Sequence, residues 1–467
     1  MVSNSLRDKD LAYTLHPYTN LRAHETRGPL VLVRGEGVRV FDEQGKGYIE
    51  AMAGLWCTSL GFSERRLAEA AKRQMDTLPF AHQFSHKAHE PGIELAARLI
   101  KMAPVPMSKV FFANSGSEAN DTVIKMVWYF NNALGRPDKK KIISRRRGYH
   151  GVTVASASLT ALPVNQRDFD LPIDRILHTD TPHAYHEALP GESDDDFATR
   201  LANNLEAQIL AEGPDTVAAF IAEPVMAAGG VIVPPQSYFP KIQAVCRKYD
   251  VLTIADEVVC GFYRTGNAWG SITMDYAPDI LTCAKALSSA YLPISAVMVN
   301  DRVYQAIADN SAKIGSFGHG YTYSAHPVAA AVALETLKIY EERDIQSQVR
   351  EVGPHLQKHL DDLASHPLVG EKRGIGLIGA LELVEDKATH KNFEPSRGVA
   401  ARVVDAMEKK GVISRAMMND SLAFSPPLII TKPELDEVFG VVREALDEVA
   451  ASLCLRQNGR GNPAIFL

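Results

Sequence analysis

Five short apolar runs, each followed by polar or reactive residues, are the feature that most constrains the fold of this chain. Stretches with helical patterns separate the runs, which end at Phe112, Ile143, Ala222, Ala255 and Cys283. Short, nearly continuous apolar strands that alternate with helices favour a largely parallel sheet covered on both faces. Functional groups gather at the strand ends of such sheets. We therefore expect an α/β fold with a site along one edge of its sheet.

The length of 467 residues predicts two lobes, because one hydrophobic core rarely organises a chain of this size. Residues 66–326 carry the apolar runs and are predicted to form the large domain. Residues 1–65 contain a hairpin pattern, and residues 327–467 open with an alanine-rich helix. We assign both flanking segments to a smaller α+β domain. The glycines between Gly374 and Gly379 are interpreted as turn or close-packing residues, in preference to a dinucleotide-binding loop.

Charge and composition argue against several functions. A net charge of -6 gives no general attraction to nucleic acid or to an anionic membrane. The basic run at residues 139–141 and 145–147 is interpreted as a solvated face. No apolar stretch is long enough to cross a bilayer, and residues 1–10 cannot supply the hydrophobic part of a secretory signal. The odd number of cysteines, without a close metal-like pair, predicts reduced thiols in a cytoplasmic protein and no metal site. They are Cys57, Cys246, Cys260, Cys283 and Cys454.

A turn of small, hydrogen-bonding residues follows the first apolar run. Residues 114–117 let the chain turn sharply before a helix that we expect to begin near Glu118. Free backbone amides and the helix dipole at such a start stabilise a phosphate dianion, and the hydroxyls of Ser115 and Ser117 add donors beside Gly116. An ordinary capped helix start is the alternative.

Two acidic residues end later runs. Asp256 follows an apolar strand, where an unpaired carboxylate is costly to bury, and a protonated pyridine nitrogen would compensate its charge. The alternative is that Asp256 or the adjacent Glu257 caps a helix or pairs with Arg264. Glu223, before a proline, could orient a cofactor through a hydrogen bond or serve a purely structural role.

Lys285 lies among small residues just after the last run, and 285 − 256 = 29 positions after Asp256. Desolvation would favour its neutral, reactive amine. An amine, an anion for a pyridine nitrogen and a phosphate cradle are together what pyridoxal 5'-phosphate requires. Lys285 would hold the cofactor aldehyde and then act as the base that moves a proton on the substrate. A surface lysine is the alternative.

Longer motifs around these residues resemble one family. They include residues 16–19, 51–57 and 425–428, and above all the signatures at 256–266 and 319–327. The chain resembles the class III, fold-type I, pyridoxal-phosphate-dependent aminotransferases, and it is most similar to the omega-transaminases that use pyruvate as amine acceptor. The resemblance covers nearly the whole chain.

The resemblance implies further cofactor contacts. Tyr149 would stack on the cofactor ring with support from His150, and Val258 would pack on the opposite face. Thr322, with Tyr321 before it, would reach the phosphate of the neighbouring subunit. A homodimer with its active site at the subunit interface is then the minimum active unit, and a tetramer stays open. Spacing alone would favour a core aromatic at Tyr149 and a local turn hydroxyl at Thr322.

Substrate residues are also implied by the resemblance. Aromatic and apolar walls would limit the size of the amine substituent. These walls would be formed by Tyr18, Leu55, Trp56, Phe84 and Tyr149. Arg415 matches a mobile arginine that pairs with a substrate carboxylate and swings away for an uncharged amine, and guanidinium geometry suits that role.

The chain departs from the family pattern at a few positions. Ala286, Ala290 and Ala325 stand where glycine is frequent, which reduces backbone freedom. Val259 replaces a glutamine frequent in the aminobutyrate and ornithine branches and argues against them.

We therefore expect an aminotransferase that works by a ping-pong mechanism. It would move an amino group from a primary amine or omega-amino acid to an α-keto acid, with pyruvate preferred. Another enzyme on the same scaffold is the nearer alternative, either an aminomutase or a 4-aminobutyrate-type enzyme using 2-oxoglutarate. A regulatory cofactor-binding protein without turnover is the more distant one. The natural amine is not identified by the sequence.

Overall fold

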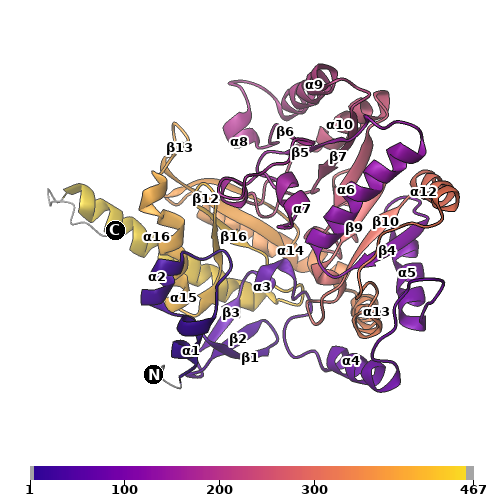
Figure 1. The fold of residues 1–467 in the computed structure, drawn as a ribbon. Coiled ribbons are helices and arrows are strands. Elements are labelled where there is room, and N and C mark those ends of the chain that lie inside the picture. The colour runs from indigo at the N-terminus through magenta and orange to yellow at the C-terminus, as the bar shows by residue number, and fades with distance from the viewer. Residues whose placement is uncertain (1–4, 459–467) are drawn as a thin grey trace.

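The computed structural model describes residues 5–458. The outermost parts of the predicted first and last segments, residues 1–4 and 459–467, lie outside this range. Figure 1 shows the arrangement of the elements along the chain.

The elements are named in chain order as in Figure 1. The α-helices are α1 Leu6–Tyr13, α2 Leu21–Arg27, α3 Ala53–Trp56, α4 Arg65–Thr77, α5 Glu90–Met102, α6 Gly116–Ala133, α7 Val154–Leu159, α8 Ala184–Glu187, α9 Asp194–Glu212, α10 Tyr238–Lys248, α11 Gly270–Thr273, α12 Asp301–Ile314, α13 Pro327–Glu342, α14 Ile345–Leu363, α15 Val399–Lys409 and α16 Lys432–Asn458. Short 3-10 helices occur at η1 Pro163–Asn165, η2 Lys285–Leu287 and η3 Pro395–Arg397. The strands are β1 Leu32–Glu36, β2 Arg39–Asp42, β3 Gly47–Glu50, β4 Lys109–Ala113, β5 Lys141–Arg145, β6 Ile176–Thr179, β7 Val217–Ala222, β8 Leu252–Asp256, β9 Ile280–Cys283, β10 Ser295–Val299, β11 Val369–Ile375, β12 Ile378–Asp386, β13 Lys391–Asn392, β14 Val412–Ile413, β15 Arg415–Met417 and β16 Ser421–Phe424.

The central sheet has seven strands in the order β4-β10-β9-β8-β7-β5-β6. All pairs from β9 to β6 are parallel, whereas β10 runs antiparallel to both of its neighbours. The five predicted runs form β4, β5, β7, β8 and β9. The expected α/β fold with a mainly parallel central sheet is confirmed.

Both faces of this sheet are buried, which explains why its strands are apolar at nearly every position. Successive residues of a strand point to opposite faces. In β7, Ala219 and Ile221 pack beneath α6 and α12, whereas Phe220 and Ala222 belong to the larger core that includes α9, α10 and α13. The sequence therefore could not alternate between apolar and polar residues here.

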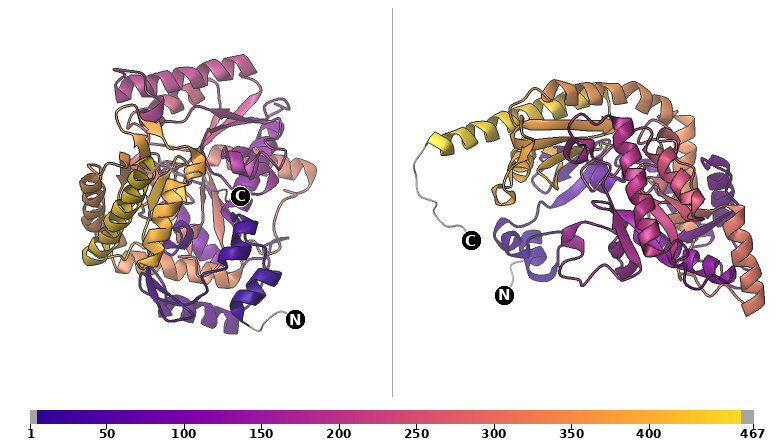
Figure 2. Two further views of the ribbon diagram at one scale, coloured as in Figure 1. Left: turned by 90° about the vertical axis from the view of Figure 1, so that its left-hand side faces the viewer. Right: turned by 90° about the horizontal axis from the view of Figure 1, so that it is seen from above.

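The amino-terminal and carboxy-terminal parts of the chain meet in a second sheet. Its order is β1-β2-β3-β14, and β14 pairs in parallel with β3. A third sheet contains β11, β12, β16 and β15, with β13 paired to β12. The views in Figure 2 show the indigo amino-terminal strands grouped with the carboxy-terminal elements, apart from the magenta elements of the central sheet. The boundaries near residues 65 and 326 stay a prediction.

Most of the basic run at residues 139–141 and 145–147 is not a solvated face, so that interpretation was wrong except at Arg146, whose side chain is 68% exposed. Lys139 and Lys140 are buried, and the Lys139 ammonium donates to the carbonyls of Pro214 and Tyr249 at 2.8 and 3.1 Å. Arg145 is fully buried and donates to the Glu223 carbonyl. These cations satisfy backbone carbonyls inside the fold, so their positions in sequence did not reveal their burial.

Other expectations about the scaffold can be compared directly. The glycines after Gly374 form the tight β11–β12 turn, where Gly376 has a φ of +57°, so the turn interpretation is confirmed. Cys57, Cys246, Cys260 and Cys283 are free thiols, whereas Cys454 lies outside the described side chains. Within residues 5–458, every helix is too short or too polar to span a bilayer.

Candidate active site

The predicted functional residues follow the carboxyl ends of the central strands. Gly116 lies just beyond β4, Tyr149 beyond β5, Glu223 beyond β7 and Lys285 beyond β9, while Asp256 is the last residue of β8. Because these strands run in one direction, their ends form a single edge of the sheet. Residues that are far apart in sequence therefore converge on one cavity.

Lys285 occupies an unusual backbone position at the start of η2. Its φ of +48° is in the left-handed region, which non-glycine residues rarely adopt. The following turn is held by the amides of Ser288 and Ala290, which donate to the Lys285 carbonyl at 3.2 and 3.3 Å. Burial lowers the pKa of the lysine amine from its usual value, so the neutral form is favoured. Strain of this kind is held by its surroundings and is common at reactive sites.

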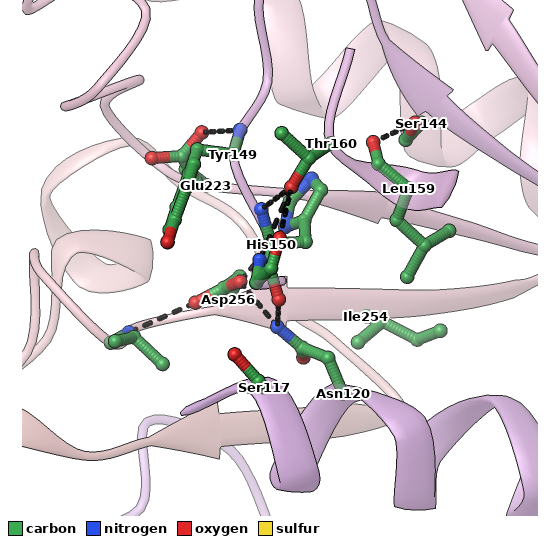
Figure 3. Close-up of polar contacts among 12 residues, drawn as sticks. Ser117, Asn120, Ser144, Tyr149, His150, Leu159, Thr160, Glu223, Ile254 and Asp256 are labelled. Carbon is green, nitrogen blue, oxygen red and sulfur yellow. Dashed lines mark hydrogen bonds and ion pairs between the residues drawn. The ribbon is translucent and has the colours of Figure 1, made fainter. Parts of the chain in front are cut away.

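Two buried side chains hold Asp256 in place (Figure 3). Its Oδ2 atom accepts hydrogen bonds from Asn120 Nδ2 and from His150 Nδ1, both at 2.8 Å. Its Oδ1 atom accepts from the Val258 amide at 3.1 Å. The same Asn120 amide also donates to the His150 carbonyl at 2.7 Å. The carboxylate is thus buried and fixed in orientation by its donors.

The adjacent acid, Glu257, has a different role. Its two carboxylate oxygens accept from the amides of Gly270 and Ser271 at 2.9 and 2.6 Å, which caps α11. Burial raises the pKa of Glu257 to about 7. The helix-capping alternative therefore holds for Glu257 and not for Asp256. Arg264 donates to the carbonyls of Leu377 and Pro426, so it is occupied elsewhere.

Glu223 holds the loop that carries Tyr149. One carboxylate oxygen accepts from the Tyr149 amide at 3.1 Å, and the other accepts from the Ala227 amide at 3.0 Å. Burial raises the pKa of this carboxyl group. Burial also raises the pKa of the Tyr149 hydroxyl, and its hydrogen bond with Tyr18 adds to that shift.

The start of α6 presents free donors to the same edge. Ser115 is the N-cap, and its hydroxyl accepts from the Glu118 amide at 3.1 Å. The amides of Gly116 and Ser117, in the first turn, find no hydrogen-bond partner among the described residues. A Cβ atom on Gly116 would lie 3.2 Å from the Val258 side chain, so a larger residue would crowd this corner. The helix begins at Gly116, two residues earlier than expected.

Eight of the predicted cofactor residues line one cavity of about 120 Å³. These residues are Gly116, Ser117, Tyr149, His150, Glu223, Asp256, Val258 and Lys285. A second cavity of about 510 Å³ adjoins the first, because Lys285, Glu223, Tyr149 and Val259 line both. The predicted substrate residues Tyr18, Leu55, Trp56 and Arg415 belong to this second cavity.

Arg415 extends from β15 into the second cavity, over two aromatic rings. Its guanidinium carbon lies 5.8 Å from the centre of the Tyr18 ring and 5.5 Å from that of Trp56. The Lys285 Nζ atom lies 5.4 Å from the same Trp56 ring. No carboxylate of residues 5–458 forms an ion pair with Arg415. A partly buried cation without an internal partner is suited to an incoming anion.

Four predicted residues are not brought to these cavities within a single chain. The Ser115 side chain caps α6. The Phe84 ring packs against Gly320, where a Cβ atom would lie 2.7 Å from it. The Tyr321 hydroxyl donates to the Glu118 carbonyl at 3.1 Å, and Thr322 is exposed. The contact of Thr322, with Tyr321 before it, with a second subunit stays a prediction.

Comparison with known proteins decides the family. A family model described as Aminotransferase class-III matches residues 21–446, which is most of the chain. The chain belongs to the class III aminotransferases.

This class III aminotransferase has close relatives with two kinds of name. It is 52% identical over 421 residues to gamma aminobutyrate transaminase 1, mitochondrial, of Solanum lycopersicum, covering 90% of this chain and 82% of the relative. It is 56% identical to a solved omega-transaminase from Pseudomonas jessenii in complex with PMP, with a TM-score of 0.95 over 98% of this chain and 100% of the other. A solved transaminase with L-ala is 60% identical, with a TM-score of 0.89 over 91% of this chain and 100% of the other. The fold is therefore that of the fold-type I transferases.

The aminotransferase uses pyridoxal 5'-phosphate, and its first cavity fits that group. The free amides of Gly116 and Ser117 suit a phosphate. Asp256 supplies the anion for a pyridine nitrogen, and Lys285 supplies the amine. Tyr149 and Val258 line the same space, where a flat ring needs walls. The buried Nε2 atom of His150 has no partner in the described structure, as expected beside a site that a further polar group completes.

Asn120 is a site residue of the aminotransferase that sequence reasoning missed. It is 1% exposed and bonds both Asp256 and His150. A polar residue among the mostly apolar buried residues of α6, between Ala119 and Val123, was the available signal. The second cavity also has lining residues that were not predicted. These are Pro17, Leu162, Val164, Asn165, Ala228, Ala416, Met417 and Met418.

Proposed function

We propose that this aminotransferase moves the amino group of a primary amine or omega-amino acid to pyruvate. The observation that carries the proposal is the unpaired Arg415 beside the aromatic walls of the larger cavity. A guanidinium binds the carboxylate of a keto acid, and the aromatic rings receive the apolar part of an amine. The relative solved with L-ala supports pyruvate as acceptor, because alanine is the aminated form of pyruvate.

The chain's own residues divide the work. When bound, pyridoxal 5'-phosphate carries the amino group between substrates and accepts negative charge from the substrate carbon. Asp256 would supply the anion that keeps the ring nitrogen positive, and Asn120 and His150 hold the Asp256 carboxylate in place. Lys285 Nζ would take the proton from the substrate Cα and deliver it to C4′ of the cofactor. Its lowered pKa makes the amine available as a base.

A second candidate is the transfer from 4-aminobutyrate to 2-oxoglutarate. The names of the plant relatives favour 4-aminobutyrate as a donor. Val259 lines both cavities and offers no hydrogen-bonding side chain, which supports the pyruvate branch. The two candidates share all chemistry at Lys285 and differ only in donor and acceptor.

Acceptor preference separates the two candidates. The enzyme is first converted to its aminated form with excess amine and freed of that amine, and then pyruvate or 2-oxoglutarate is added while cofactor absorbance is followed. We expect pyruvate to restore the aldehyde form faster. A faster return with 2-oxoglutarate would favour the second candidate. A panel of amines, diamines and omega-amino acids in the forward half-reaction identifies the donor class.

We further propose that the active unit is a homodimer with its active site at the subunit interface. Phe80, Phe84 and Tyr323 are all substantially exposed, and the rings of Phe80 and Tyr323 lie 6.0 Å apart. An apolar cavity of about 380 Å³ beside them is lined by Tyr323 and by Asn114, the first residue of the phosphate-binding turn. Such a contiguous apolar surface is typical of a subunit interface. Thr322 is exposed and directly precedes Tyr323 in the chain, and it would face the neighbouring active site.

Complementation between subunits tests the homodimer. We expect the Lys285→Ala homodimer and the Thr322→Val homodimer each to lose activity. A mixed dimer of the two variants should regain activity at one of its two sites, where both Lys285 and Thr322 are intact. A monomer by light scattering, or no gain on mixing after subunit exchange is demonstrated, would argue against the shared site.

We also propose a cytoplasmic location, supported by the four free thiols. Fractionation of source cells tests it.

A further inference from the structure

The amino-terminal arm, residues 5–27, supplies part of the substrate cavity without a core of its own. Neither α1 nor α2 contains a buried residue. The loop between them nevertheless brings Pro17 and Tyr18 into the cavity wall. Polar contacts must therefore hold the arm in place.

One group of contacts closes the arm on itself. The Nε2 atom of His16 lies 2.9 Å from both carboxylate oxygens of Asp10, and the Nε2 atom of His24 lies 3.0 Å from Asp10 Oδ2. The two imidazole rings are 4.1 Å apart. The ligand atoms that Asp10, His16 and His24 offer all lie within 4.8 Å of one another. The side chains of Asp10, His16 and His24 are only 20%, 27% and 12% exposed.

We propose that Asp10, His16 and His24 bind a divalent transition-metal ion of the Zn²⁺ class, which locks the arm that carries Tyr18. Two imidazole nitrogens and one carboxylate are ligands that Zn²⁺ prefers, and water completes such a site. Ligand atoms of a tetrahedral zinc ion lie about 3.3 Å apart, because each is about 2.0–2.2 Å from the metal. The present separations of 2.9 and 3.0 Å need to widen by only a few tenths of an ångström.

Charge also favours a metal at this cluster. Two neighbouring imidazolium ions repel each other, whereas two neutral imidazoles and a carboxylate suit a dication. The nearby cations are engaged elsewhere: Arg7 donates to the carbonyls of Arg27 and Thr26, and Arg27 pairs with Asp405 and Glu408. They leave the carboxylate of Asp10 to the two histidines and the Thr14 hydroxyl.

The other histidine and carboxylate clusters of residues 5–458 are less suited. The cluster of His183, His186 and Glu382 already contains the cation Arg373, which would repel a metal ion. In the cluster of His355, His359 and Asp436, the carboxylate side chain is 57% exposed and binds less strongly in competition with water. The cluster of His355, His359 and Asp436 is the matched control for the cluster in the arm.

Metal binding would act on the substrate cavity through chain closure. The ligands span residues 10–24 and enclose Pro17 and Tyr18 in one loop. A link across a loop lowers the number of conformations that the free loop can adopt. The metal would therefore hold Tyr18 against its partners Asn165 and Tyr149. Only this effect on the cavity rests on the proposed function, whereas the metal site itself does not.

Equilibrium dialysis of the cofactor-loaded enzyme against Zn²⁺ tests the site directly. We expect His16→Gln, His24→Gln and Asp10→Asn each to weaken the tightest zinc binding by at least about tenfold. The double variant His355→Gln/His359→Gln should keep that binding. Equal zinc binding by the wild type and all three arm variants would overturn the site, as would its loss in the double variant alone.

Limited trypsin digestion tests the effect on the arm without substrate. The Arg22 side chain is 89% exposed, so cleavage after it reports opening of the arm. We expect zinc to slow this cleavage in the wild type and in the His355→Gln/His359→Gln variant, but not in His24→Gln. Cleavage that zinc leaves unchanged in the wild type would overturn the proposed locking. Because neither experiment uses a substrate, a wrong donor or acceptor assignment cannot affect the result.

Discussion

The Nδ1 atom of His150 donates to Oδ2 of Asp256 at 2.8 Å, and both buried residues line the cofactor cavity. Asn120 donates to the same oxygen from α6. The carboxylate is therefore held in position by the protein alone. An electrostatic group that is already oriented costs no reorganisation when charge develops in the reaction.

Asp256→Asn should slow the amine half-reaction by at least about 100-fold, because loss of one oriented electrostatic group costs about 10²–10³ in rate. Stopped-flow absorbance of the cofactor measures this change. Glu257→Gln is the matched control, since Glu257 caps α11 and lies outside both cavities. It should lower the unfolding free energy by about 1–3 kcal/mol and leave the half-reaction largely unchanged. The reverse pattern would show that the two acids have been assigned the wrong roles.

Arg415→Ala should separate the two half-reactions. The keto-acid half-reaction should slow by about 10- to 100-fold, because hydrogen bonds to a charged group contribute about 1.5–3 kcal/mol. The half-reaction of an uncharged amine should change little, since the aromatic walls stay in place. Single-turnover rates with pyruvate and with an uncharged amine provide the measurement. Equal losses in both would remove Arg415 from substrate binding.

Glu382→Gln should destabilise the protein in a pH-dependent manner. Burial alone would raise the pKa of Glu382, but the hydrogen bond from His186 and the charge of Arg373 together lower it to about 2. A lowered carboxyl pKa contributes stability above its unfolded value of 4.5, and this is lost as pH falls towards 2. We expect a cost of about 3 kcal/mol at pH ~7 that shrinks below pH ~4. Thermal midpoints of the wild type and of Glu382→Gln, compared at pH ~7 and well below pH ~4, check this expectation. A difference in midpoint that does not change with pH would refute it.

Ala290→Gly should stabilise the protein. Ala290 is exposed and has a φ of +63°, a conformation that costs about 1–2 kcal/mol for an L-residue. Glycine removes that strain but makes the unfolded chain more flexible, so a net gain of about 0.5–1 kcal/mol is expected. Ala286→Gly is the control, because Ala286 is buried without a positive φ and should lose stability. Denaturation midpoints distinguish the two variants. A loss of stability in both would contradict the proposed backbone strain at Ala290.

Local patterns in the sequence were sufficient to predict the sheet edge and its reactive residues. Asp256 and Lys285 follow continuous apolar strands, and burial of both strand faces explains that pattern. The sequence could not assign different roles to Asp256 and Glu257, because adjacent acids look alike until the backbone sets their directions. In the structure, Asp256 lines the cavity and Glu257 caps a helix.

Contacts between distant parts of the chain account for what the sequence did not reveal. Asn120 lies 136 positions before its partner Asp256. The carbonyls that bury Lys139 are 75 and 110 positions away, so a basic run suggested a solvated face. The sequence shows alanine at positions 290 and 325 where glycine is frequent, but only the fold shows that both residues have left-handed φ angles.

Trapping of the cofactor link tests most directly whether Lys285 holds the cofactor. The fully loaded enzyme is reduced with borohydride, digested, and mapped for the pyridoxyl-labelled peptide by mass spectrometry. We expect the label on Lys285 and nowhere else, and no label in Lys285→Ala. A label on another lysine, or an unlabelled peptide from fully loaded protein, would contradict the central role of Lys285.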